Sequence, residues 1–470
     1  MKPFNSFREF IRLLEDKNEL CRIKKEVDKD WEISTVTRKT WMDFRDNARP
    51  CLYFDRIKNY QIPVAMGVYA TQRRVAYSLG VFEEDPRKEW EKTRDLFVQA
   101  EENRYKPVLV EDGPCQENVL IGDDVDITSL LPVPTWTPGK DVGPYITAGG
   151  TVSKDPETGE VNVGIYRLQV KGPRKLGLYP SPGADLFYHW KNSEKLNKPL
   201  PVAVIVGNAP IIQYPAFYKV PYCEYDLAGG FQGGPLEVVK AKTVDIEVPA
   251  LTEIVIEGYI RPNYLEEEGP WGEAFGVVCP KRMNPVIEIT AVTYRNNPVY
   301  HAFMSSGVPG TASSTRAAVK PFWVYNTLKR SGVPEVYDIY MPEAATGSQI
   351  LIVSIKKQWE FHPRHVMHAV WGSKNNYDSK FILVTDSDVN IRDSFELTRA
   401  IFMRVEPSKD VVMLREGGSH AVDPNSVTEE TTAKVGIDAT MPYKYDLSMP
   451  ADEYFEKVSS SWSEYGILPL

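Results

Sequence analysis

The sequence predicts a mixed α/β (α+β) protein with more than one domain. At 470 residues the chain exceeds what one hydrophobic core usually holds, so two or three domains are expected. Its middle reads as mostly β, and its last third alternates helical segments with buried β segments. Its composition, 42% hydrophobic and 25% charged, is that of an ordinary soluble globular protein.

The first part of the chain opens with a helix signal. Ser6 and Glu9 have the spacing of a capping box, in which each would bond the other's backbone. One helical face collects the apolar side chains Phe7, Phe10, Ile11 and Leu14. A second helix is expected over 86–101, and the proline-rich stretch 106–145 looks like a connection into a new unit.

The middle part reads as a series of strands. The stretch 151–171 predicts a hairpin around an Asp-Pro-Glu-Thr-Gly turn, and 201–207 is a continuous apolar strand. Further strands are expected in 251–260 and in 285–304, the latter as two strands joined at Arg295-Asn296-Asn297. A helix at 184–196 interrupts them.

The last part shows the alternation typical of a sheet with crossover helices. After a Gly/Ser/Pro loop at 305–314, strands are expected within 348–357 and 379–389. Helices are expected around HPRHVMHAV and SFELTRAIFMRV. The end, 451–470, reads as an amphipathic helix with an apolar tail that docks on this chain or on a neighbouring subunit.

Charge and cysteine content disfavour several classes of function. The net charge of −9 with no long basic run argues against nucleic acid or an anionic membrane as the main partner. No apolar stretch reaches about 18 residues, and the charged N-terminus lacks a signal-peptide core. Five scattered cysteines without a CxxC pattern fit a reducing compartment, so a cytoplasmic location is expected.

Two motifs give only weak support for a nucleotide site or a metal site. The glycine-rich GGFQGGP lacks the spacing of a dinucleotide fingerprint, and no Gly-Lys-Ser/Thr occurs, which disfavours ATP chemistry. His362, His365 and His368 invite a metal interpretation, but the third points away from the first on a helix and no HExxH pattern is present. A partly exposed amphipathic helix is the better interpretation.

The segment EEEGPWGEAFG (266–276) places Glu268 and Glu273 around a Gly-Pro-Trp-Gly corner. Gly269 and Gly272 permit backbone angles closed to other residues, and Pro270 fixes one dihedral. Such a corner can hold two carboxylates in a set relation. The competing interpretation is a solvated acidic loop.

Arg167 lies in the otherwise apolar strand 162–170, and a buried arginine needs an anionic partner. It is either a clamp for a carboxylate or phosphate, or part of a structural salt bridge. Strict alternation puts Asn162 and Arg167 on opposite faces, so they serve one site only if the strand bulges or a ligand wraps its end. Glu237, in PLEVVK, joins Asn162 as an oxygen donor suited to Mg²⁺ or Mn²⁺.

Taken in order, these motifs resemble the UbiD-type family of prenylated-FMN-dependent (de)carboxylases. The resemblance runs from Asn162-x-x-x-x-Arg167 through PLEVVK, DIEVPALTEIVIEGYI and EGPWGEAFG to GSKNNYDSKFILVTDSDV and SHAVDP. It implies a central split β-barrel cofactor domain at 116–310. An N-terminal α/β region at 1–115 and a C-terminal α/β domain at 311–470 with a terminal docking helix would flank it. Family members are oligomeric, so a homo-oligomer, dimer or hexamer, is expected.

The resemblance also implies a reaction. This is the reversible non-oxidative decarboxylation of an aromatic, heteroaromatic or α,β-unsaturated acid, through a covalent adduct with prenylated FMN. A divalent metal, Mn²⁺ or Mg²⁺, would hold the cofactor phosphate, and K⁺ is allowed as a further ion. A flavin prenyltransferase would supply the cofactor, and CO₂ would be released or consumed.

Carried over by position, the resemblance assigns roles to particular residues. Its catalytic residues are Arg167, Glu268 and Glu273. Its cofactor-binding residues are Asn162, Ile165, Tyr166, Arg167, Glu237 and Lys374, the last near the phosphate. Its metal ligands are Asn162, Asp185 and Glu237, with His189 the rival of Asp185 one helical turn later. Arg404 matches an arginine near the monovalent-cation site, and Trp271 would form a flat wall for a ring.

Two other classes of function stay open at this point. The chain could be one subunit of a multi-component aromatic carboxylase, or a metal-dependent hydrolase that uses the glutamate pair with a bound water. The substrate is also open, with a mild preference for an aromatic ring. Four residues could bind a second polar group of the substrate or have a structural role: His301, Ser305, Ser306 and Arg316.

Overall fold

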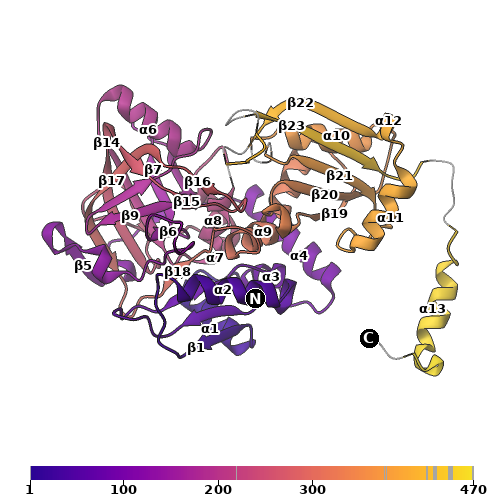
Figure 1. Ribbon diagram of the computed structural model, residues 1–470, viewed down its shortest axis with the longest axis horizontal. Helices are drawn as coiled ribbons and strands as arrows, with labels where there is room; N and C mark the ends of the chain where they lie inside the picture. Colours follow the sequence, from indigo (N-terminus) through magenta and orange to yellow (C-terminus); the bar gives the residue numbers. More distant parts are fainter. Residues whose placement is uncertain are drawn as a thin grey trace.

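The protein is a mixed α/β structure, as expected, in a computed structural model that describes residues 2–218, 220–374, 376, 378–419, 422–426, 431–442 and 448–467. Figure 1 shows the N-terminal and central segments forming one large body, with a C-terminal sheet beside it and the last helix at the far end. His420 and Ala421 of the SHAVDP motif lie outside the described residues. Among the described residues, no helix is both long and apolar enough to cross a membrane.

The N-terminal region packs helices against a four-stranded sheet of order β1-β2-β3-β18. Its elements are α1 (Phe7–Asp16), β1 (Leu20–Ile23), α2 (Glu32–Asp43), β2 (Cys51–Phe54), β3 (Val64–Met66), α3 (Gln72–Ser78) and α4 (Pro86–Glu102), joined by β18 (Tyr300–Ala302). The predicted apolar face of α1 is buried. The capping box does not form, because the Ser6 side chain makes no hydrogen bond to the helix.

The central region is built on a nine-stranded sheet of order β6-β9-β10-β17-β14-β11-β7-β8, with β5 also pairing β17. This sheet does not close into a barrel. The elements up to α7 are β4 (Val108–Leu109), β5 (Asn118–Ile121), α5 (Ile127–Leu130), β6 (Tyr145–Ile146), β7 (Gly150–Lys154), β8 (Val161–Ile165), β9 (Leu168–Gly172), β10 (Lys175–Leu178), α6 (Asp185–Leu196), β11 (Leu200–Val206) and α7 (Pro210–Gln213). Those that follow are α8 (Glu224–Gln232), β12 (Glu237–Lys240), β13 (Glu247–Pro249), β14 (Ile254–Glu268), β15 (Trp271–Gly272), β16 (Val278–Cys279) and β17 (Arg282–Tyr294).

The apolar strand β11 shows where the core lies. Ala203 and Ile205 belong to a cluster that continues into the N-terminal helices and α8, whereas Val202, Val204 and Val206 belong to a second cluster across the sheet. Because alternate side chains of a strand point to opposite faces, a strand buried on both faces reads as one apolar run. This explains the sequence PVAVIVG.

One strand prediction in this region is wrong in detail. The expected strand 162–170 is interrupted, since β8 ends at Ile165 and β9 begins at Leu168 and pairs with different neighbours. The two strands expected within 285–304 are both present, but they do not pair with each other. β17 stays in the central sheet, whereas β18 crosses to the N-terminal sheet and pairs in parallel with β3. The domain limits 1–115, 116–310 and 311–470 stay a prediction.

The C-terminal region is a five-stranded sheet of order β19-β20-β21-β23-β22. Its elements are α9 (Thr311–Arg330), β19 (Val336–Tyr340), β20 (Ile350–Ile355), α10 (His362–Trp371), β21 (Phe381–Asp386), α11 (Ser394–Arg404), α12 (Pro407–Asp410), β22 (Val411–Gly418) and β23 (Thr431–Ala439). The parallel pairs β20·β21 and β21·β23 confirm the predicted crossover pattern. The loop expected over 305–314 is shorter, because α9 already begins at Thr311.

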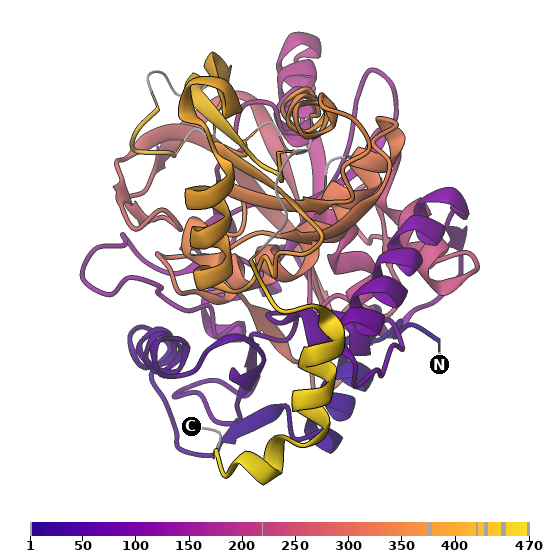
Figure 2. The ribbon, with the colours of Figure 1, turned by 90° about the vertical axis from the view of Figure 1, so that its right-hand side faces the viewer.

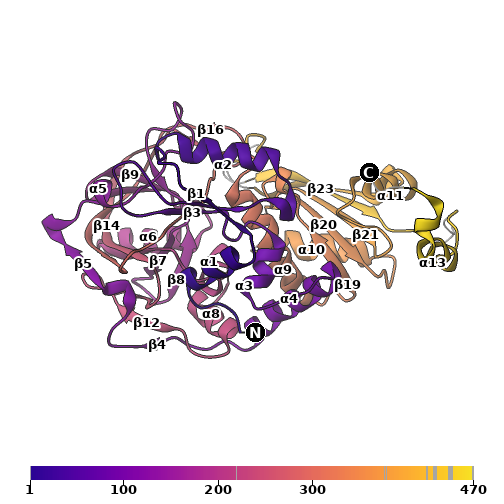
Figure 3. The ribbon, with the colours of Figure 1, turned by 90° about the horizontal axis from the view of Figure 1, so that it is seen from below.

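The last described helix, α13 (Asp452–Ser460), has no buried residue. Figures 1 to 3 show it at the edge of the C-terminal region, away from the central sheet. Its apolar side chains Tyr454, Phe455 and Val458 are exposed. The amphipathic helix is therefore present, but its apolar side is not buried by the described part of this chain.

Candidate active site

The centre of the site is an arginine held between two glutamates. Arg167 Nε donates to Glu268 Oε1 at 3.0 Å and its Nη2 donates to Glu268 Oε2 at 2.9 Å. Its Nη1 donates to Glu273 Oε1. The side chains of Arg167 and Glu268 are buried, and that of Glu273 is 14% exposed. Such a bidentate, desolvated pair is both strong and directional.

The corner between the two acids forms as the glycines predicted. β14 ends at Glu268, and Gly269 follows in the left-handed region with φ +95°. Gly272 is required because of close packing around it rather than because of its backbone angles. A Cβ there would lie 2.2 Å from Thr137 Oγ1, and its N–H donates to Asp141 Oδ1 at 2.7 Å. Only a residue without a side chain lets the corner reach this depth, and it turns Glu273 back towards Arg167.

The indole of this corner does not form a ligand wall. Trp271 is 1% exposed and packs on Tyr145 with ring centroids 4.2 Å apart. The expectation that Trp271 forms a flat wall for a ligand ring is therefore wrong for the described structure, because the indole is buried by core packing. Trp271 instead supports the guanidinium of Arg167, which lies 6.0 Å from its ring.

Further contacts keep the arginine and its first acid in place. The Arg167 guanidinium lies 4.3 Å from the ring centroid of Tyr179. Asn284 Nδ2 donates to Glu268 Oε2 at 3.1 Å. The two acids raise the pKa of Arg167 even though its burial lowers it, so the guanidinium remains charged in this setting. The alternative of a solvated acidic loop is excluded for Glu268, which is wholly buried.

A second cluster lies at the other end of the same segment. β8 ends at Ile165, and the ring of the following residue, Tyr166, lies over Gly164, where a Cβ would meet it at 2.6 Å. Tyr166 interacts with Asn162 and with Asp185 at the start of α6. Lys374 Nζ, from the C-terminal region, binds Asp185 Oδ1 at 2.6 Å.

An acid that sequence reasoning missed completes this cluster. Glu224, the first residue of α8, is buried, and its Oε2 accepts from the Val163 N–H at 2.8 Å. Burial, reinforced by Asp185, raises the pKa of Glu224 well above its usual range, and Lys374 opposes the rise. One signal was available: Glu224 and Asp226 are acids inside the otherwise apolar stretch PYCEYDLAGG.

Glu237 is not brought to this cluster. It is exposed at the start of β12, in the small sheet β13-β12-β4, whereas Asn162 lies in the nine-stranded sheet. The expectation that Glu237 joins Asn162 and Asp185 is therefore wrong in geometry. The PLEVVK motif marks a strand start, and the acid that reaches the segment holding Asn162 comes from α8, where Glu224 accepts from the Val163 N–H.

Other candidates are also placed by the fold. His189 Nδ1 shares a hydrogen bond of 2.9 Å with Ser153 Oγ, and burial lowers the pKa of His189. Arg404 pairs with Asp388 at 2.6 Å, so acids of its own domain balance its charge. Ile165 ends β8 and packs near Phe303. Along the described chain no group of three His, Cys, Asp or Glu side chains could hold a metal.

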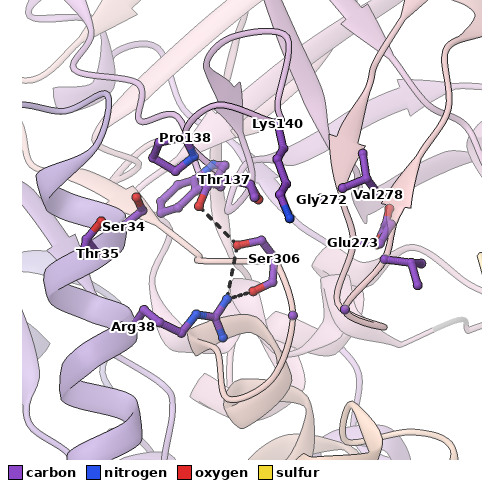
Figure 4. Close-up of a pocket in the computed structure, with 14 residues that line it drawn as sticks. Ser34, Thr35, Arg38, Thr137, Pro138, Lys140, Gly272, Glu273, Val278 and Ser306 are labelled. Atoms are coloured by element: carbon purple, nitrogen blue, oxygen red, sulfur yellow. Dashed lines mark hydrogen bonds between the residues drawn. The ribbon is translucent and has the colours of Figure 1, made fainter.

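A cavity of about 290 Å³ adjoins Glu273. Helix α2 and the loops around 137–140, 272–278 and 306–307 line it. Figure 4 shows Arg38 bound to Ser306 at one wall and Lys140 extending towards the cavity. The Gly307 N–H donates to the Glu273 carbonyl at 2.7 Å, which ties this wall to the acid pair.

This fold, with an arginine clamp over two acids and a cluster of oxygen donors at the other end of one segment, matches that of known carboxy-lyases. Three family models match in order: the N-terminal (residues 11–96), Rift-related (106–308) and C-terminal (315–439) domains of 3-octaprenyl-4-hydroxybenzoate carboxy-lyase. The chain belongs to the UbiD family.

Individual relatives cover nearly the whole chain. An uncharacterised protein of Archaeoglobus fulgidus is 32% identical, with 98% of each chain covered. The UbiD-class enzyme HmfF of Pelotomaculum thermopropionicum, in complex with prFMN as an evolved dimeric form, is 31% identical, covers 96% of this chain and 98% of its own, and has a TM-score of 0.80. Vanillic acid decarboxylase (ShVdcCD) of Sedimentibacter hydroxybenzoicus in closed form is 28% identical, covers 98% and 100%, and has a TM-score of 0.87.

Proposed function

We propose that this chain catalyses the reversible, non-oxidative decarboxylation of an aromatic, heteroaromatic or α,β-unsaturated carboxylic acid. The observation that carries the proposal is the Arg167 guanidinium between Glu268 and Glu273. A preorganised guanidinium fork can receive a substrate carboxylate, and a carboxyl beside it can move a proton. The family membership and the vanillic acid decarboxylase among the similar structures support this reaction class.

We propose prenylated FMN, made by a flavin prenyltransferase, as the cofactor. Loss of CO₂ leaves an electron pair on carbon that no ordinary side chain accepts, and a bound flavin of this kind supplies that electron sink. The prFMN complex of HmfF supports the choice. On this chain, Ile165, Tyr166 and Arg167 would line the cofactor and Lys374 would meet its phosphate. Asn162 and Arg167 are five residues apart, so the two clusters lie within about 17 Å of each other.

We propose Mn²⁺ or Mg²⁺ at the second cluster, held by Asn162, Asp185 and Glu224 in place of the expected Glu237. Carboxylate and amide oxygens suit such cations. The donor set fits: the buried Asn162 amide nitrogen lacks a hydrogen-bond partner among the described residues, although it lies beside the Tyr166 hydroxyl. Glu224 is an enclosed acid without an ion-pair partner in the described chain. The ion pair between Arg404 and Asp388 gives no support for a K⁺ ion near Arg404.

The chain's own residues then divide the work. Arg167 would orient the substrate carboxylate, and Glu268, held by Asn284, would keep the guanidinium in place. Glu273 would hold a proton on a carboxyl oxygen and pass it to the carbon that loses CO₂, or accept it in the reverse direction. Buried Trp271 and Tyr145 would keep water from this end of the site.

A partner-dependent role is the alternative with an observation in its favour. One similar structure, 27% identical over 98% of this chain, contains a truncated second component, ShVdcD. Here the exposed apolar side of α13 offers a surface for a neighbour. Turnover by the purified chain alone separates the two possibilities. The hydrolase alternative loses support, because Arg167 contacts both acids that would have to position a water.

We further propose a cytoplasmic homo-oligomer, dimer or hexamer. The five cysteines are all free, which fits a reducing compartment. The unburied side of α13 fits burial against another copy.

The deciding experiment is to express the chain with and without a flavin prenyltransferase and record absorbance and native mass spectra of both preparations. A flavin mass with one prenyl-derived addition, a divalent metal and CO₂ release from a panel of aromatic acids would support the proposal. Apo-protein in both preparations, with no uptake on reconstitution, would overturn it.

A further inference from the structure

One peptide group lies between Arg38 and Glu273. The Ser306 carbonyl accepts from Arg38 Nη2. The N–H of the same peptide group belongs to Gly307 and donates to the Glu273 carbonyl at 2.7 Å. Arg38 also donates to the carbonyl of Pro309 from Nη1 and to the Ser306 hydroxyl from Nη2 at 3.3 Å. A single guanidinium from α2 therefore fixes this loop on both sides of the N–H group that binds Glu273.

The contact through Gly307 ties the Glu273 backbone to a distant part of the chain. Among the described residues, the other backbone hydrogen bonds of Glu273 are local. Its N–H donates to the Val277 carbonyl at 2.8 Å, and its carbonyl also accepts from the Gly276 N–H at 3.0 Å. The two loops also pack together, because a Cβ on Gly307 would lie 3.8 Å from the Gly276 Cα. The position of the Glu273 backbone, and with it the reach of its carboxyl, therefore depends on the loop that Arg38 holds.

The charge of Arg38 has no acid beside it. This side chain is half-buried, its described hydrogen bonds all go to the loop 306–309, and no described carboxylate pairs with it. Burial lowers the pKa of Arg38, and the acid that opposes this effect, Glu343, already binds Arg49. A merely structural tie between a helix and a loop needs only a neutral donor, which would avoid the cost of burying a charge.

A charged donor acts further than the carbonyl that accepts from it. Hydrogen bonds from a charged group are stronger than neutral ones, and hydrogen bonds in a chain polarise one another. The positive charge on the Ser306 carbonyl therefore makes the N–H of the same peptide group a better donor to Glu273.

We propose that Arg38 is a positioning residue for the proton-transfer step, which holds Glu273 in place through the peptide group between Ser306 and Gly307. This rests on the proposed role of Glu273 as the acid that passes the proton. None of the described hydrogen bonds of Arg38 involves Arg167 or the second cluster, so Arg38 acts through Glu273 and not on a ligand. Arg38 and Glu273 line the same cavity (Figure 4), so a guanidinium ion can fill the space that Arg38→Ala would leave.

Steady-state kinetics of holoenzyme variants test this proposal. Arg38→Ala should lower kcat about 10- to 100-fold, because a displaced proton donor is costly, and should change KM less than about threefold. Solvent deuterium incorporation into the substrate should fall together with kcat. Guanidinium chloride at millimolar concentration should raise the kcat of this variant at least about fivefold and in a saturable way. Urea, which has a similar shape without the charge, and sodium chloride at equal ionic strength should not.

Hydrogen exchange followed by mass spectrometry is a second measurement, which does not need turnover. In Arg38→Ala the segments 268–278 and 304–310 should exchange faster than in wild type, because the peptide group that joins the two loops is no longer fixed. Guanidinium should reverse this increase, whereas urea should not.

Further variants serve as controls. Lys39→Gln removes the neighbouring positive charge of α2, which is exposed and pairs with Asp43 at 2.9 Å, and it should leave kinetics and exchange unchanged. Arg38→Lys and Arg38→Gln cover the case that the alanine variant does not fold. The lysine variant keeps a charged donor and should retain more of the wild-type kcat than the glutamine variant, whose donor is neutral.

The outcomes separate the proposal from its alternatives. A kcat of Arg38→Ala within about twofold of wild type, or a change in KM alone, would overturn it. Equal activity of Arg38→Lys and Arg38→Gln, or a loss of turnover that guanidinium does not reverse, would also overturn it, because a merely structural role predicts these results. Absence of turnover with every acid in wild type, with the exchange response to guanidinium intact, would count against the proposed decarboxylation alone.

Discussion

Arg167 donates a hydrogen bond to each carboxylate oxygen of Glu268, from Nε at 3.0 Å and from Nη2 at 2.9 Å. The two residues are 101 positions apart in sequence, and both side chains are buried. Glu268 therefore orients Arg167, and the third nitrogen of the fork reaches Glu273. This division into a holding acid and a reacting acid leads to the first two predictions.

Replacing the reacting acid should abolish turnover without emptying the site. Glu273→Gln keeps the shape but can neither lose nor deliver a proton in the same way, so kcat should fall at least about 100-fold. Flavin absorbance and metal content should stay at wild-type levels. Solvent deuterium incorporation into the substrate, followed by NMR, reports the proton step itself. Full exchange in this variant would remove Glu273 from that role.

Replacing the holding acid should cost stability as well as activity. Glu268→Gln leaves the buried Arg167 with half of its counter-charge, and breaking a buried ion pair costs about 3 kcal/mol or more. The midpoint of thermal unfolding should drop by several degrees. The matched control is Glu267→Gln, whose carboxylate is exposed and pairs with Lys281 at the surface, where about 1 kcal/mol or less is expected. Equal midpoints for the two variants would contradict the assigned burial of Glu268.

Metal content should follow Glu224 and not Glu237. Glu224→Ala, Asp185→Ala and Asn162→Ala should each lower bound Mn²⁺ at least tenfold, because each removes an oxygen donor of the same cluster. Glu237→Ala removes an exposed carboxylate in a different sheet, and His189→Ala removes a ring bonded to Ser153, so both should keep their metal. Plasma emission spectrometry of the purified variants measures this. Undiminished metal in Asp185→Ala would reject Asp185 as a ligand.

The stability of the chain should depend on pH through Glu89. This acid lines a cavity of about 570 Å³ between α4, α9 and the C-terminal sheet, and burial raises its pKa to about 7. The folded state then binds more protons than the unfolded state between pH of about 4.5 and 7, so stability falls as the pH rises through this window. Glu89→Gln should remove that loss, gaining about 1 kcal/mol at pH 8 and nothing at pH 5 after allowance for solvent.

Thermal midpoints at both pH values, compared with wild type, check this. Glu91→Gln, on the exposed side of the same helix and paired with Arg87, is the control. A gain of equal size at both pH values would mean that Glu89 acts through packing rather than through its proton.

The sequence by itself determined the local elements and the acid corner. Apolar periodicity placed α1, and a second helix was expected over 86–101, where α4 lies. The continuous apolar run of β11 marked a buried strand, and the alternation after residue 311 predicted the parallel C-terminal sheet. The resemblance to the UbiD family, which rested on ordered motifs, is confirmed along with the fold class. Glycine and proline chemistry likewise predicted a tight turn between Glu268 and Glu273, because these constraints act within a few residues.

Only the tertiary structure decided which distant side chains meet. Glu224 reaches the segment that holds Asn162 because α8 packs beside β8, where its carboxylate accepts from the Val163 N–H. No spacing rule in the chain separates Glu224 from Glu237. β18 pairs with β3 rather than with the preceding β17, and this pairing places β18 as a buried strand of the N-terminal sheet. Trp271 packs in the core rather than forming a wall of the ligand site, because its ring packs against Tyr145. In each case the outcome depends on burial and pairing with partners that are far away in sequence. The free energy of these contacts leaves no signal in the local sequence.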